Sequence, residues 1–160
     1  MRVELRAALH LCDEIFRIIK SHVPSHRALD EAWAALCDLR TAAERGRDHV
    51  KAVRGANLLT IHWMTPKGGP PHDRAVFFLA RLLREAALLV SKDHANQWSG
   101  YIQPTKTAAA SALWHLGPGG PGSGRAAADR VEEIWQDGMV TVNTAELVPE
   151  TSHPYGDGLW

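Results

Sequence analysis

Residues 75–90 read AVFFLARLLREAALLV, and this stretch decides the fold class of the 160-residue chain. It lies in a predicted helix over residues 74–92, in which four of the charged side chains form one narrow stripe: Arg74, Arg81, Glu85 and Lys92. A helix that is apolar around most of its circumference is normally enclosed by other helices. The stretch is too short and too charged to span a bilayer. It therefore predicts the central helix of a helical bundle, and we expect no membrane partner.

The segments before this helix also have helical periodicity. Apolar residues recur every three or four positions along residues 2–22, and Pro24 is expected to end that helix. A second helical stretch runs over residues 26–63, where Gly46 and Gly55 mark bends or a break into two helices. Apolar residues keep a helical period along this stretch: Leu29, Trp33, Leu36, Ala43, Val50 and Ile61.

The short turn at residues 24–26 predicts that the first two helices are antiparallel neighbours, with Phe16 near Trp33 and Cys12 level with Cys37. Two cysteines are too few for a disulfide framework, and both occupy apolar positions where inert thiols are usual. The charged N-terminal stretch has no apolar segment typical of a signal peptide. These features favour a reduced, cytoplasmic protein.

The region after residue 95 begins with an irregular segment, 96–103. Pro104 suits the first turn of a helix that ends at about Leu116. The following segment, GPGGPGSG at 117–124, is expected to be a flexible connector.

A last helix is predicted over residues 125–137, with Gly138 at its end. Residues 139–160 are rich in Pro, Gly, Ser, Thr and Asn, which predicts an extended acidic tail with at most one short strand at 139–142. The sequence thus predicts an all-α bundle of four or five helices over residues 1–138, followed by that tail.

The formal net charge of zero conceals a gradient along the chain. Residues 1–95 contain 15 Lys and Arg against 11 Asp and Glu, whereas residues 96–160 contain 3 against 7. A protein built wholly around a nucleic-acid backbone usually has a basic excess. The polarised halves instead favour a protein partner or self-assembly. In the second case the acidic region from Asp129 onward docks on a basic stripe at 40–54 of a neighbouring copy, head to tail.

That basic stripe consists of four cations that fall within about 60° of arc if residues 26–63 form one helix: Arg40, Arg47, Lys51 and Arg54. They are candidate anion-binding residues, suited to a nucleic-acid backbone without sequence specificity. The alternative is an ordinary solvated face on which Glu44 and Asp48 pair with the cations.

Nine histidines raise the question of a metal or catalytic site. His22 and His26 are four residues apart, but Pro24 lies between them, and no other zinc-ligand spacing occurs, so we expect no metal and no cofactor. Arg17 and His22 have an arginine, four-residue, histidine spacing that resembles HEPN ribonucleases, which are small and all-helical. The resemblance implies that Arg17 holds the scissile phosphate and His22 moves protons. Ile18 departs from that pattern, which favours a polar residue there.

Six tryptophans are spread at about one per predicted element, which is typical of residues that fill junctions between helices. The aromatic residues in the irregular segment and the tail fit that role least. They are candidate partner-binding residues because loop and tail aromatics are good anchors: Trp98, Tyr101, Tyr155 and Trp160.

No catalytic constellation is recognisable apart from the Arg17–His22 spacing. The sequence therefore favours a non-enzymatic α-helical accessory or adaptor subunit of a larger assembly, acting through helix surfaces and the C-terminal tail. A nucleic-acid-binding subunit of a nucleoprotein complex is one alternative, and an HEPN-like ribonuclease is another.

Overall fold

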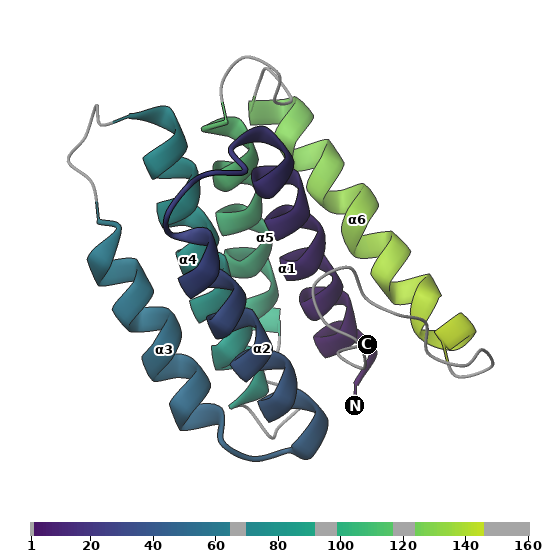
Figure 1. The fold of residues 1–160 in the computed structure, drawn as a ribbon. Coiled ribbons are helices and arrows are strands. Elements are labelled where there is room, and N and C mark those ends of the chain that lie inside the picture. Colours follow the sequence, from purple (N-terminus) through teal and green to yellow (C-terminus); the bar gives the residue numbers. More distant parts are fainter. Residues whose placement is uncertain (1, 65–69, 92–98, 117–123, 146–160) are drawn as a thin grey trace.

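The computed structural model describes residues 2–64, 70–91, 99–116 and 124–145. Over these ranges the chain is all-helical and has no strand, which confirms the predicted fold class (Figure 1). The helices are α1 (Val3–His22), α2 (Leu29–Arg45), α3 (His49–His62), α4 (Pro71–Val90), α5 (Ser99–Trp114) and α6 (Gly124–Ala145).

Helix α4 is the centre of the bundle, as its apolar sequence predicts. It packs against α1, α2, α3 and α5. Its buried side chains include Leu79, Leu82, Leu83 and Leu89, each at most 1% exposed. None of the described helices combines the length and the apolar character that a membrane span requires.

The predicted register of α1 against α2 is confirmed at its aromatic contact. The rings of Phe16 and Trp33 lie 5.5 Å apart between centroids. Cys12 and Cys37 form no disulfide. Arg40 acts electrostatically on both thiols, and burial raises the pKa of each. Both cysteines therefore remain protonated at neutral pH, in agreement with inert thiols.

The described residues form six helices and not four or five, because the stretch 26–63 is divided between α2 and α3. Gly46 ends α2 in the left-handed region, with φ at 66°, and its N–H donates to the carbonyl of Ala42. Asp48 has the same φ. Two left-handed residues so close together reverse the chain direction, so that α3 turns back along the bundle. Gly55 lies inside α3 without breaking it.

Two expectations for the C-terminal half are wrong. Helix α5 begins at Ser99, so residues 99–103 are helical and Pro104 lies inside the helix. Helix α6 continues past Gly138 to Ala145, so residues 139–142 are helical and not a strand. The predicted tail is thus helical up to Ala145, and its remaining residues, 146–160, lie outside the described residues, as does most of the predicted connector.

Gly138 permits a close crossing of α6 over α1 and does not end the helix. A Cβ atom placed on Gly138 would lie 2.9 Å from the Cα of Ala7 and 3.2 Å from the Cβ of His10. Real Cβ atoms do not approach backbone so closely, so the crossing requires a residue without a side chain.

Helices α3 and α6 form opposite edges of the bundle (Figure 1). Among the described helices, α3 contacts α2 and α4, whereas α6 contacts α1 and α5. Each of the two helices therefore has an outer face that no other described helix covers.

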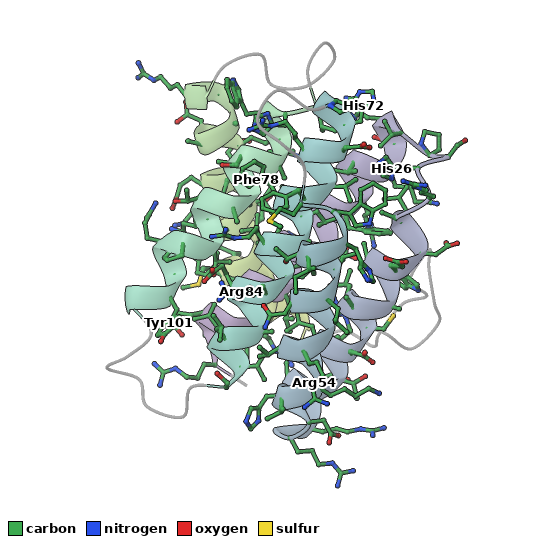
Figure 2. The ribbon with its side chains drawn as sticks, turned by 90° about the vertical axis from the view of Figure 1, so that its left-hand side faces the viewer. His26, Arg54, His72, Phe78, Arg84 and Tyr101 are labelled. Atoms are coloured by element: carbon green, nitrogen blue, oxygen red, sulfur yellow. The ribbon has the colours of Figure 1, made fainter. Side chains whose placement is uncertain are left out.

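His26 joins the turn before α2 to the start of α4. Its Nδ1 accepts the backbone N–H of Ala28 at 3.2 Å, and its Nε2 donates to Asp73 Oδ1 at 2.8 Å. The imidazole also packs on Trp63, with 4.7 Å between ring centroids. Figure 2 shows His26 near the end of the bundle where His72 lies, in the first turn of α4.

His26→Ala should lower the free energy of unfolding by about 1–3 kcal/mol, because a part-buried donor and acceptor lose their partner. Chemical denaturation monitored by circular dichroism measures the change. His72→Ala is the matched control, since His72 is exposed, and should change stability by less than about 0.5 kcal/mol. Equal effects of the two variants would contradict the linking role.

Candidate protein-interaction face

The outer side of α3 presents apolar side chains to solvent. We define the α3 face as Val50, Lys51, Arg54, Leu58 and Ile61, which lie within about 100° of arc on the helix. Val50 is 59% exposed, Leu58 is 51% exposed and Ile61 is 63% exposed. Figure 2 looks onto this edge of the bundle, with Arg54 near its lower end.

The opposite side of α3 explains why these apolar residues face outward. Ala52, Ala56 and Leu59 are buried, so α3 packs on its neighbours through mostly small side chains. The Nε of Arg84 on α4 donates to the Oδ1 of Asn57 at 2.7 Å, which fixes the rotation of α3 against α4. The larger apolar residues are thereby left on the outer side.

The α3 face is basic as well as apolar, because α3 contains no Asp or Glu. Lys51 Nζ lies 3.7 Å from Asp38 Oδ1 on α2, and the Lys51 side chain is 73% exposed. Arg47, just before α3, lies 3.9 Å from Asp48 and is 71% exposed. Ion pairs this exposed are weak, so these cations are accessible to a partner.

The four cations predicted to form one anion-binding stripe do not share a helix. Arg40 lies in α2 and is 3% exposed, within electrostatic range of Asp13 on α1. Only Arg47, Lys51 and Arg54 lie at or near the α3 face. The predicted stripe required a single helix over residues 26–63. Because α2 ends at Gly46, Arg40 is separated from the other three cations.

The ribonuclease-like pair lies on α1. Arg17 Nε is 2.9 Å from Asp13 Oδ2, and His22 Nδ1 donates to the carbonyl of Ile18 at 2.9 Å. Five residues correspond to about 140° around a helix, so within one chain Arg17 and His22 point to different sides. Among the described residues, no three His, Cys, Asp or Glu side chains form a group that could hold a metal ion.

The outer side of α6 carries the opposite charge. We define the α6 face as Asp129, Glu133, Gln136, Asp137 and Val140, which are all exposed and lie within about 100° of arc. Glu133 pairs with Arg130 on the same helix at 3.2 Å, with both side chains largely exposed. The face therefore remains predominantly acidic.

A groove of about 350 Å³ lies between α5 and α6. Lys106 and Glu132 form an ion pair within it, 3.0 Å apart, and the Lys106 ammonium also lies 4.9 Å from the centroid of the Trp135 ring. Because the two charges neutralise each other, the groove has no clear preference for a charged ligand.

The candidate aromatic anchors are placed only in part. Tyr101 lies on α5 and is half-buried against the core, so it is not in a loop. Trp98, Tyr155 and Trp160 lie outside the described residues. Val50 and Ile61 keep the helical period of the predicted stretch but are exposed and do not belong to the core. On a helical wheel for residues 49–62, Ala52 and Ala56 lie opposite Val50 and Ile61, so the side of α3 with the smaller apolar residues is the buried one.

No protein family, curated protein or solved structure matches the chain. The described residues form an all-α bundle whose two edge helices carry faces of opposite charge.

Proposed function

We propose that this protein is a non-enzymatic α-helical adaptor that binds a protein partner through the α3 face. The observation that carries the proposal is the exposure of three large apolar side chains on α3: Val50, Leu58 and Ile61. Apolar side chains gathered on a surface are typical of interaction sites. The acidic region beyond Ala145, with Tyr155 and Trp160, is a second proposed contact of the adaptor.

The composition of the α3 face favours a protein as the partner. Burying a Leu, Ile or Val side chain contributes about 1.5–3 kcal/mol, and a protein surface can supply the apolar area that this requires. Lys51 and Arg54 lie beside these residues, where charged groups select and orient a partner more than they add affinity.

Nucleic-acid binding is the second candidate, supported by the exposed cations Arg47, Lys51 and Arg54. Contacts to phosphates would use these cations and leave Leu58 and Ile61 without a role. The two candidates therefore predict different sensitivities to substitution of the apolar residues.

Leu58→Glu combined with Ile61→Glu should reduce partner capture at least about tenfold, since 1.4 kcal/mol corresponds to a factor of ten. The immobilised chain serves as bait in an extract of the source cells, and quantitative mass spectrometry measures the bound proteins. Trp114→Glu on α5 is the control, because Trp114 is also about half exposed, at 52%. The Trp114→Glu bait should capture as much partner as the unsubstituted chain.

Circular dichroism first establishes that all three baits are folded. Undiminished capture by the α3 variant, or an equal loss in the control, would contradict the proposal. Nuclease treatment of the extract separates the second candidate, because capture through nucleic acid would then disappear from every bait.

A further inference from the structure

Building on the proposed function, we infer that the α3 face binds the α6 face of a second copy of this chain, so that copies associate head to tail. The two faces lie at opposite edges of one bundle and do not contact each other within it (Figure 1). A contact between them therefore joins different copies.

The charges of the two faces are complementary. The α3 face has Lys51 and Arg54 on a helix without any acidic residue. The α6 face has acids at every fourth position from Asp129 through Glu133 to Asp137. Charge complementarity of this kind selects partners and fixes their register.

The two faces also match in register. If α3 of one copy lies parallel to α6 of the next, one offset of 82 residue numbers places Lys51 opposite Glu133 and Leu58 opposite Val140. Arg54 then falls beside Asp137. Val140 is 66% exposed, so the apolar end of the α3 face meets an apolar residue that has no cover within its own chain's described residues.

Symmetric pairing of identical faces is less favourable. Arg54 is near the middle of the span from Val50 to Ile61, so a two-fold contact between α3 faces would bring two copies of Arg54 together without an acidic residue on either helix. Two α6 faces would similarly bring carboxylates together. A contact between unlike faces avoids both, and such contacts generate open chains or closed rings.

The size of the contact sets its strength. Helix α3 has 14 residues, a length of about 21 Å. A contact along one helix of this length is smaller than the roughly 1,200–2,000 Å² buried in stable interfaces. We therefore expect weak association that increases with protein concentration and decreases with salt.

Sedimentation velocity of the full chain at low salt and over increasing concentration tests the inference. The unsubstituted chain should form species larger than a monomer. Lys51→Glu with Arg54→Glu, and separately Asp129→Lys with Glu133→Lys, should each weaken association at least about tenfold. A chain carrying all four substitutions should associate again, because the charges are complementary once more.

The control reverses two exposed cations outside both faces, Arg45→Glu with Arg81→Glu, which changes net charge as much as the α3 variant. It should associate like the unsubstituted chain. Association that survives the Asp129 and Glu133 substitutions would indicate an α3–α3 contact and overturn the inference. A chain that remains monomeric at all concentrations would also overturn the inference. The proposed adaptor function is judged separately, by extract capture with the Leu58 and Ile61 variant.

Discussion

Gly138→Val should lower the free energy of unfolding by about 3 kcal/mol, and Gly138→Ala by about 1–2 kcal/mol. Even the single Cβ of alanine would lie 2.9 Å from the Cα of Ala7, which is backbone and has no side-chain rotation to relieve the contact. Helix α6 would have to move away from α1. The loss of packing along that interface outweighs the gain of about 1 kcal/mol that alanine normally gives over glycine inside a helix.

Gly55→Ala is the matched control for this prediction. Gly55 also lies inside a helix, α3, but a Cβ atom there would meet no atom within 4 Å. The same substitution should therefore raise the free energy of unfolding, by about 0.5–1 kcal/mol. Chemical denaturation of both variants gives the two signs directly. A stabilising effect at both positions would show that α6 does not depend on a close crossing at Gly138.

The contrast between these glycines shows what the sequence can and cannot predict. A glycine after a helical run satisfies the pattern for a helix end, and Gly46 does end α2 with φ at 66°. Gly138 follows a similar run, but its neighbour is Ala7, at the other end of the chain. A close approach between segments that are distant in the sequence leaves no local signal. The predicted end of the last helix, at residue 137, is therefore too early, because α6 continues to Ala145.

The orientation of α3 likewise depends on contacts with segments outside the helix itself. Apolar periodicity alone predicted α1 and the central helix α4, because those helices are covered on several sides and almost any rotation buries their apolar residues. Helix α3 is an edge helix, and only its contacts with α2 and α4 decide which side faces inward. Val50 and Ile61 therefore fit the helical spacing of apolar residues although they lie outside the core.

Arg40→Met should lower the free energy of unfolding by about 3 kcal/mol, because it removes one member of a buried charge pair. Arg40 and Asp13 are each 3% exposed. Burial lowers the pKa of Arg40 to about 9, while Asp13 is the largest influence opposing that shift. The guanidinium therefore remains charged at neutral pH. Its loss leaves the buried Asp13 carboxylate with one cation fewer, while the Nε of Arg17 lies 2.9 Å from its Oδ2.

A second substitution distinguishes a charge pair from simple packing. Asp13→Leu combined with Arg40→Met should recover at least about 1 kcal/mol of the loss, since an apolar pair often replaces a buried ion pair at little cost. Arg45→Met, at an exposed position on the same helix, should change stability by less than about 0.5 kcal/mol. Equal losses at Arg40 and Arg45, or no recovery in the double variant, would contradict a buried pair.

The Arg40 variant also tests how the cations divide between structure and binding. If Arg40 joins α1 to α2, Arg40→Met reduces stability, whereas Arg54→Met leaves it unchanged because Arg54 is exposed. If Arg40 instead contacts phosphates, Arg40→Met weakens nucleic-acid binding and leaves the midpoint of denaturation where it was. Burial of Arg40 favours the first result, since a side chain 3% exposed reaches a phosphate only after α1 and α2 separate.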